Sequence, residues 1–256
     1  MKKILQCIFV FSFFINFDLY GFHPNVVVAQ TASLVSPGMK VGQKNTALVI
    51  TDPQNDFLSP KGVAWNLVKD SVAKNHTIEN IELLLKTAKK NKFKVFVSPH
   101  YYYPYDQKWM FGGAMEHSMH DLKMYQRKGP LNLEGFEGSG ADFLDKYKPY
   151  INDGQTVITS PHKIYGPEAN DLVLQLRKQG ITRVILAGMS GNLCVESHMR
   201  ELIEQGFEVA VVHDATASAK MKDLDGDKAA KINFRMIASA SWSTNETIDK
   251  MKSTHR

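Results

Sequence analysis

Short runs of β-branched and aliphatic residues alternate with segments of helical periodicity along most of this chain, and this alternation narrows the fold class more than any other feature. The runs predicted as strands are residues 46–51, 94–98, 156–160, 183–188, 208–213 and 236–240. The clearest helical segments between them are residues 78–90, 170–179 and 194–205. Strands that are apolar on both faces and separated by helices indicate a parallel sheet covered on two sides. The sequence therefore predicts a doubly wound α/β domain.

Composition excludes several classes of protein. The 256 residues are 43% hydrophobic and 22% charged, which is enough apolar material for a full core. The formal net charge is only +5, and the basic residues are interspersed with acidic ones. Because no basic stripe is interleaved with aromatic residues, nucleic-acid binding is not expected. Two cysteines also exclude a disulfide framework.

The first 29 residues have the layout of a secretory signal. Lys2 and Lys3 precede an apolar run at residues 4–15, and small residues at 27–29 allow a cut before Gln30. A cut near Gly21 is an alternative, and an amphipathic helix is disfavoured because residues 1–20 have no polar face. We therefore expect a signal peptide at 1–29, an extension lying along the domain at 30–44 and the main domain at 45–256. The mature protein should be soluble outside the inner membrane, in the periplasm of a bacterium.

Signal removal would take away Cys7 and leave Cys194 as the only cysteine. An unpaired thiol is unusual in an oxidising compartment and calls for a chemical reason. Cys194 follows the predicted strand at 183–188 and begins a predicted helix. Free N–H groups and the dipole at a helix N-terminus favour a thiolate. The sequence therefore predicts a reactive cysteine.

Two further polar residues follow strands of the same sheet. Asp52 follows the run at 46–51, and Lys163 follows the run at 156–160. Ligands of open α/β sheets bind beyond the carboxyl ends of the strands, where the strand order reverses. Asp52 could accept the proton of the Cys194 thiol, and the Lys163 cation nearby would further favour the thiolate. These groups suit attack on a carbonyl–nitrogen bond.

Three segments make the sequence recognisable: ALVITDPQNDF at 47–57, SPHK at 160–163 and GMSGNLCVES at 188–197. Together they resemble the isochorismatase-like cysteine hydrolases, a superfamily with nicotinamidases, N-carbamoylsarcosine amidase and ureidoacrylate amidohydrolases. The similarity runs from about Asn45 to Ala219. The resemblance implies a six-stranded, mainly parallel sheet of order 3-2-1-4-5-6 with helices on both faces. It also implies a homo-oligomer.

The resemblance further implies an Asp52, Lys163 and Cys194 triad, although His162 leaves the alignment at Lys163 open by one position. It places a cis peptide at Met189–Ser190 and an oxyanion hole at the amides of Ser190 and Cys194. The implied activity is hydrolysis of a C–N bond in a small amide, ureide or carbamoyl substrate through a thioester, with no cofactor. Two alternatives remain: an isochorismatase-type hydrolase that does not use the cysteine, and a non-catalytic binding member of the fold.

Other residues are candidates for substrate or metal binding. Phe57, His100 and Tyr165 are predicted to line the substrate pocket. Nicotinamidases bind a divalent ion through an Asp-x-His element after the second strand, but here Ser98 stands where the carboxylate should be. No metal is therefore expected, and the open alternative is a three-nitrogen site of His100, His117 and His120. The aromatic residues at 101–104 with Trp109, Met110 and Phe111 form either a lid or wall of the pocket, or a packing element or subunit contact. His198 is expected to pack or to face solvent.

Overall fold

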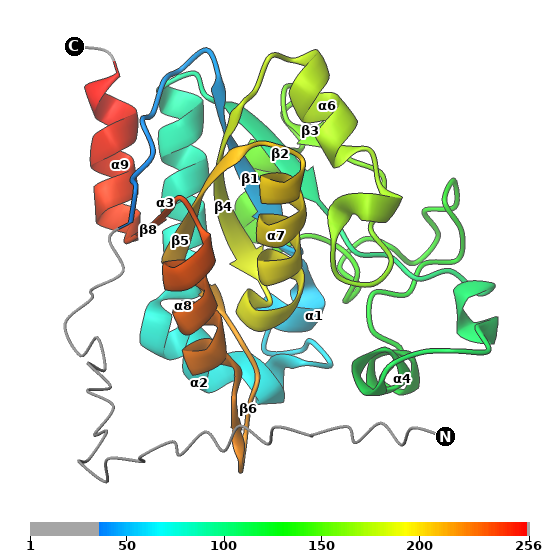
Figure 1. Cartoon of the computed structure of the whole chain (residues 1–256). Coiled ribbons are helices and arrows are strands. Elements are labelled where there is room, and N and C mark those ends of the chain that lie inside the picture. Colours follow the sequence, from blue (N-terminus) through cyan, green and yellow to red (C-terminus); the bar gives the residue numbers. More distant parts are fainter. Residues whose placement is uncertain (1–35, 255–256) are drawn as a thin grey trace, which may run out of the picture. The chain divides into compact units, whose positions relative to one another are not determined.

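Six parallel strands form the central sheet in the order β3-β2-β1-β4-β5-β8 (Figure 1). This computed structural model describes residues 36–254. The predicted fold class and strand order are confirmed, whereas the predicted signal peptide lies outside the described residues. The strands of the sheet are β1 (Thr46–Thr51), β2 (Lys94–Ser98), β3 (Val157–Ile158), β4 (Arg183–Met189), β5 (Glu208–Ala217) and β8 (Ala240–Trp242).

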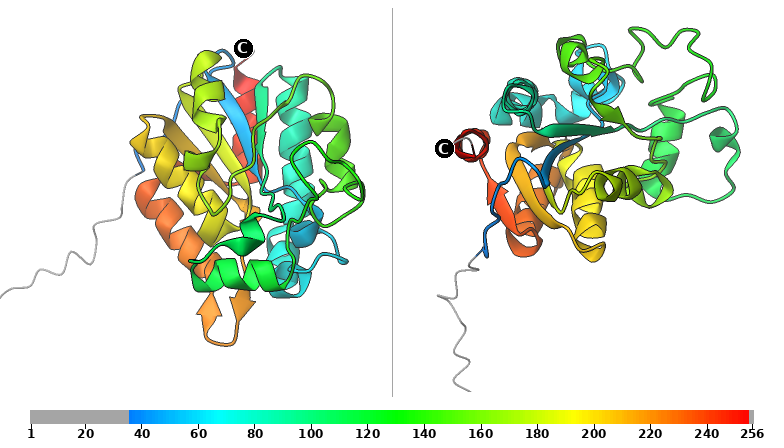
Figure 2. Two further views of the ribbon diagram at one scale, coloured as in Figure 1. Left: turned by 90° about the vertical axis from the view of Figure 1, so that its right-hand side faces the viewer. Right: turned by 90° about the horizontal axis from the view of Figure 1, so that it is seen from above.

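Helices cover both faces of the sheet because the strand residues are apolar on both sides. In β1, Leu48 and Ile50 contribute to one core cluster, whereas Ala47 and Val49 contribute to the other. The first cluster packs under α2, α3 and α9, and the second under α6, α7 and α8, which gives the three layers seen in Figure 2. These helices are α2 (Trp65–Asn75), α3 (Thr77–Lys90), α6 (Leu172–Lys178), α7 (Glu196–Glu204), α8 (Gly226–Ile237) and α9 (Thr244–Ser253).

The sixth strand begins later than the sequence predicts. Met236 and Ile237 belong to the last turn of α8, and the strand starts only at Ala240. The reason is that Ala230 and Phe234 extend a buried helical stripe along α8, while Met236 points to solvent with 61% of its surface exposed. A short apolar run at the end of a helix therefore looks like a strand in the sequence.

The described part of the N-terminal extension lies against the domain. The backbone N–H of Gly38 donates to the carbonyl of Ser239, and the side-chain amide of Gln43 donates to the carbonyl of Asn91. These bonds tie residues 36–44 to the segment before β8 and to the end of α3.

The long segment between β2 and β3 has little regular structure and contributes both to the core and to the surface. Tyr101, Tyr102 and Tyr103 are buried, whereas Met110 and Phe111 are strongly exposed. The tyrosine part thus packs as a wall of the domain. The helical turns of the segment are η1 (Asp106–Lys108), α4 (Ala114–Asp121), η2 (Asp145–Tyr147) and α5 (Lys148–Ile151).

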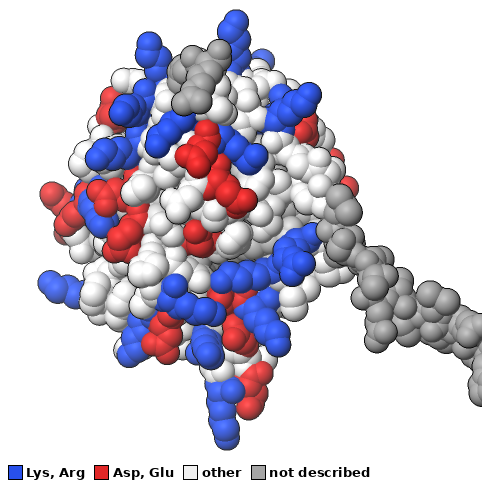
Figure 3. All heavy atoms as spheres, turned by 90° about the vertical axis from the view of Figure 1, so that its left-hand side faces the viewer, with Lys and Arg blue, Asp and Glu red and all other residues white. Residues whose placement is uncertain are grey.

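Charges on the described surface are mixed in sign. Figure 3 shows lysine and arginine side chains lying among acidic ones on the face it presents, which agrees with the interspersed charges of the sequence. A small hairpin of β6 (Lys220–Met221) and β7 (Leu224–Asp225) projects beside α8 (Figure 1). Among residues 36–254 there is no helix with both the length and the hydrophobicity needed to span a bilayer.

Candidate active site

The site lies where β1 and β4, the two central neighbours of the sheet, reach their carboxyl ends. Thr51 pairs with Gly188 in the parallel ladder, and the Thr51 hydroxyl donates to the carbonyl of Ala187. Gly188 has a φ of 118°, and a Cβ there would lie 2.0 Å from the carbonyl oxygen of Thr51. Only glycine permits this approach, which brings the residues after the two strands, Asp52 and Cys194, into one space.

Asp52 is fully buried at the turn from β1 into α1 (Asn55–Leu58). Its φ of 45° lies in the left-handed region, which aspartate tolerates better than most residues. Burial raises the pKa of Asp52 to about 6, because a charged carboxylate is poorly solvated there. The Oδ1 atom accepts a 2.8 Å hydrogen bond from Nε2 of His162, whereas Oδ2 has no hydrogen bond of good geometry.

The structure corrects the expected position of Lys163. Its Nζ donates to Oδ2 of Asp106 at 2.5 Å and to the carbonyl of Tyr101 at 2.9 Å, and it is His162 that contacts Asp52. Residues 100 and 162 pair as a parallel bridge, and successive side chains of an extended segment point to opposite sides. His162 therefore points inward and Lys163 outward. Burial lowers the pKa of His162 to about 3, so its imidazole is neutral and brings no positive charge to Asp52.

Cys194 lies in the π-helical turn η4 (Gly191–Val195), which leads directly into α7. The backbone N–H groups of Ser190 and Cys194 point at the sulfur and lower its pKa, but burial and the Asp52 charge raise the pKa well above its usual value. The resting group is thus a thiol, in contrast to the thiolate expected from the helix N-terminus and Lys163. The Met189–Ser190 peptide that precedes the turn is cis.

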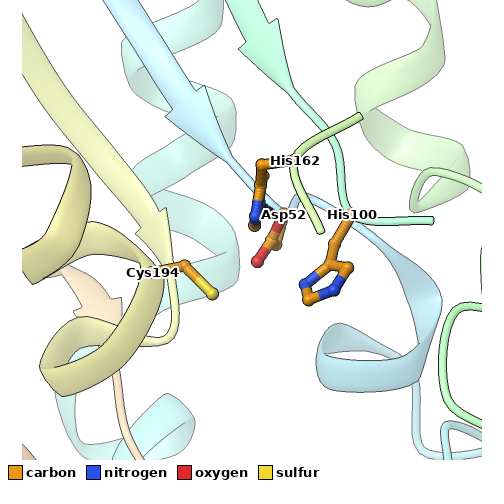
Figure 4. A group of neighbouring side chains, drawn as sticks. All are labelled: Asp52, His100, His162 and Cys194. Carbon is orange, nitrogen blue, oxygen red and sulfur yellow. Dashed lines mark hydrogen bonds and ion pairs between the residues drawn. The ribbon is translucent and has the colours of Figure 1, made fainter. Parts of the chain in front are cut away.

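His100 completes the group of side chains drawn in Figure 4. One ligand atom from each of Asp52, His100, His162 and Cys194 lies within 4.8 Å of the others, and all four residues are buried. Nε2 of His100 donates to the carbonyl of Lys163 at 2.9 Å, which leaves Nδ1 as an acceptor without a partner. Within residues 36–254, Asp52, His100, His162 and Cys194 are the side chains that lie close enough together to bind a metal ion. The alternative cluster of His100 with the two histidines of α4 is not formed.

His198 contacts the backbone of Cys194 from one helical turn further on. It is fully buried, unlike a solvent-facing residue, and its Nδ1–H donates to the carbonyl of Cys194 at 2.7 Å. Since that carbonyl can only accept, Nε2 must accept from the Ser98 hydroxyl at 2.9 Å. The Ser98 oxygen in turn accepts from the side-chain amide of Asn170. This chain fixes the backbone of Cys194 to the end of β2.

The three polar residues after Asp52 and Pro53 hold the long segment in place. Gln54 donates to the carbonyl of His100 and accepts from the His100 N–H, so both groups bond to one side chain. Asn55 donates to the carbonyl of Ser139, and Oδ2 of Asp56 accepts the N–H of Tyr125 at 2.6 Å. The QNDF part of the sequence therefore anchors the wall of the site and does not itself provide reactive groups.

The predicted pocket residues lie at different depths. Phe57 is buried and contacts Tyr125 edge to face, so it forms part of the site's outer packing. Tyr165 is partly buried, and burial and the nearby Cys194 raise its pKa. Tyr165 also lines a surface cavity of about 300 Å³ together with Ser197, which follows Cys194 by three residues.

Two buried tyrosines of the long segment, Tyr102 and Tyr125, pack around the site. Tyr102 and Tyr125 pack against the ring of His100 at 4.6 and 4.9 Å between ring centroids, and their hydroxyls have no hydrogen-bond partner. Burial raises the pKa of both, with a further contribution from Cys194. Tyr102 belongs to the aromatic segment already predicted as a lid or pocket wall. No sequence signal marks Tyr125, because only the course of the long segment brings it to His100.

The fold and the site together define an α/β enzyme of the doubly wound class, with its polar residues at the switch point of the sheet. The isochorismatase domain model matches residues 46–240, so the chain belongs to this family and is an isochorismatase-family hydrolase. The chain is 24% identical over 218 residues to the ureidoacrylate amidohydrolase RutB of Methylobacterium radiotolerans, covering 84% of this chain and 82% of that one.

Solved structures have the same fold. A cysteine hydrolase from Pseudomonas syringae pv. phaseolicola aligns with a TM-score of 0.68 at 20% identity, covering 84% of this chain and 96% of that one. N-carbamoylsarcosine amidase from Thermoplasma acidophilum aligns with a TM-score of 0.55 at 17% identity, covering 78% of this chain and 97% of that one. At these identities the structural likeness establishes the fold alone.

Proposed function

We propose that this protein is a cysteine hydrolase that cleaves a C–N bond of a small amide, ureide or carbamoyl compound through a thioester. The observation that carries the proposal is the placement of the Cys194 thiol beside Asp52 and beneath the backbone N–H groups of Ser190 and Cys194. A nucleophile, a base and two aligned donors are the groups that acyl transfer requires. The names of the ureidoacrylate amidohydrolase and N-carbamoylsarcosine amidase relatives support the same bond type.

The first step is proton transfer from Cys194 to Asp52. With its pKa raised to about 6, Asp52 is ionised at neutral pH and remains basic enough to act as a general base. The thiolate then attacks the carbonyl carbon, and the electron pair of the C=O bond moves to the oxygen. The N–H groups of Ser190 and Cys194 stabilise this oxyanion. In this scheme the proton moves to Asp52 only when substrate is bound, because the resting thiol has a high pKa.

Collapse of the tetrahedral intermediate expels the amine. The C–N bond breaks, and the leaving nitrogen takes the proton that Asp52 received from the thiol. Water then gives a proton to Asp52 and attacks the thioester, and the acid product leaves as that proton returns to the sulfur. Each proton therefore passes through one carboxylate, and the enzyme is regenerated without any other reactant.

His162 acts in this scheme as a positioning residue, in the role that the resemblance assigns to Lys163. Its Nε2–H donates to Oδ1 of Asp52, which leaves Oδ2 for the proton of the thiol. A neutral donor stabilises the carboxylate less than a lysine cation would. This difference keeps Asp52 more basic than it would be in an ion pair.

The test is an ammonia-release screen of amides, ureides and carbamoyl compounds with the wild type and Cys194→Ala. Turnover of at least one compound by the wild type and none by the variant is the expected result. Intact-mass measurement during turnover should detect the acyl group on Cys194. Full activity of a folded Cys194→Ala protein would refute the proposal and favour hydrolysis that does not use the cysteine. No turnover of any compound by the folded wild-type protein, and no acyl group on Cys194, would favour a binding role.

We also propose that the enzyme acts outside the cytoplasm. The support is the sequence layout of Lys2, Lys3 and the apolar run at residues 4–15. N-terminal sequencing of protein from the periplasmic fraction of an expressing bacterium tests this, with Gln30 as the expected first residue. Retention of Met1 in the cytoplasmic fraction would contradict it.

A further inference from the structure

The buried carboxylate of Asp52 lacks a compensating positive charge. In the described part of the chain, its polar side-chain contacts are the imidazole of His162 and the thiol of Cys194, both uncharged, and the ammonium group of Lys163 is bound to Asp106 instead. Burying an ionised carboxylate without a cation is costly. A positive charge supplied from outside the chain would offset this cost.

Several ligand atoms around Asp52 also lack hydrogen-bond partners. These atoms are Oδ2 of Asp52, Nδ1 of His100 and Nδ1 of His162, and all belong to fully buried residues. For His100 the direction is set, because Nε2–H donates to the carbonyl of Lys163 and Nδ1 faces the group shown in Figure 4. A backbone carbonyl that fixes one imidazole nitrogen so that the other can bind is the usual support of a metal-ligating histidine.

We propose that Asp52, His100, His162 and Cys194 form a tetrahedral site for a divalent metal ion of the zinc type. One sulfur, two imidazole nitrogens and one carboxylate oxygen are ligands that suit Zn²⁺ and Co²⁺, and not Mg²⁺ or Ca²⁺. Their ligand atoms lie within 4.8 Å of one another, and tetrahedral bonds of normal length would bring them to about 3.3–3.8 Å. Small side-chain rotations are sufficient for this change.

The charges of the proposed ligands match a divalent cation. Cys194 loses its proton to solvent when the sulfur–metal bond forms, and Asp52 binds as a carboxylate. The two negative ligands neutralise the two positive charges. Both imidazoles remain neutral, because His162 binds through Nε2 once its proton has moved to the unpartnered Nδ1. The bound site has no net charge, which is favourable for a group that is buried in the protein.

The expected consequence is inhibition, and this part of the inference rests on the proposed function. A metal ion bound to the sulfur occupies the lone pair with which Cys194 would attack the substrate. The site would then be a metal-sensitive control on the enzyme and would not assist hydrolysis. The binding itself does not depend on Cys194 being the nucleophile.

Cobalt titration of the chelator-treated protein tests the inference. We expect one Co²⁺ per chain, visible d–d bands of tetrahedral strength and a sulfur-to-cobalt charge-transfer band in the near ultraviolet, all removed by Zn²⁺. Cys194→Ser should abolish the charge-transfer band. His100→Ala should weaken cobalt binding by at least about tenfold, since loss of an outer-shell partner alone costs about 10–100-fold. Bound Zn²⁺ should also protect Cys194 from alkylation by iodoacetamide, measured by intact mass.

His117→Ala is the matched control, because His117 is an exposed histidine of α4 outside the cluster. This variant should bind cobalt like the wild type. The inference is overturned if no saturable binding occurs, if the charge-transfer band persists in Cys194→Ser, or if His117→Ala abolishes binding. Cobalt binding as described together with undiminished ammonia release would instead refute the nucleophilic role of Cys194 and leave the metal site intact.

Discussion

Replacement of His162 by phenylalanine should shift the acidic limb of the pH–rate profile to higher pH. The variant removes the Nε2–H that donates to Oδ1 of Asp52 at 2.8 Å, and among the described side chains the buried carboxylate then keeps the Cys194 thiol as its partner. A hydrogen bond to a charged group contributes about 1.5–3 kcal/mol, and one pKa unit corresponds to about 1.4 kcal/mol. The pKa of Asp52, about 6 in the wild type, should therefore rise by about one to two units.

The loss of rate follows from the fraction of Asp52 that is ionised. At pH 7 this fraction should fall from about nine-tenths to between about one-half and one-tenth, so kcat/KM should fall by about 2–10-fold. The rate should recover near pH 9. The assay is kcat/KM for ammonia release from pH 5 to 9, with metal removed by chelation.

Two variants of the same loop separate this mechanism from a general loss of structure. His162→Gln keeps an N–H donor near the position of Nε2 and should restore much of the wild-type profile. Lys163→Met should leave the limb where it is, because Nζ of Lys163 is bonded to Asp106 and Tyr101. If Lys163→Met moves the limb and His162→Phe does not, the assignment of His162 as the partner of Asp52 is wrong.

Three further predictions concern stability. Asp52→Asn should stabilise the protein by about 2–3 kcal/mol at pH 8. The folded state raises the pKa of Asp52 from 3.8 to about 6, so the wild type loses stability as pH rises through that window. In urea unfolding, the gain of the variant should vanish near pH 4. His100, His162 and His198 all have pKa values lowered to about 3, so below pH 6.5 the unfolded chain takes up protons that the folded chain cannot. The midpoint of urea unfolding should therefore fall steadily from pH 6.5 to pH 4. A midpoint that stays constant would contradict the neutral burial of these histidines. Gly188→Ala should lower the free energy of unfolding by at least about 3 kcal/mol, because the alanine Cβ would overlap the backbone of β1 and the φ of 118° is unfavourable for alanine. A melting temperature within a few degrees of the wild type would show that the strands can separate there without loss of stability.

Local sequence patterns are sufficient to predict much of the fold. The strand at 46–51 and the helix at 78–90 could be predicted because their apolar periodicities are unambiguous and tertiary contacts reinforce them. The sixth strand could not, because Met236 and Ile237 are apolar in either a helix or a strand. Only the packing of Phe234 under the sheet decides that α8 continues through them.

The sequence by itself determined the class of the domain, the family, and the residues that end the two central strands at Asp52 and in the turn before Cys194. These follow from periodicity and from short motifs, which are local properties of the chain. The tertiary structure decided which basic residue meets Asp52. His162 and Lys163 are adjacent in sequence, and the bridge between residues 100 and 162 turns one inward and the other outward. The same packing removes Cys194 and Asp52 from water, and burial, which no local pattern encodes, sets their pKa values.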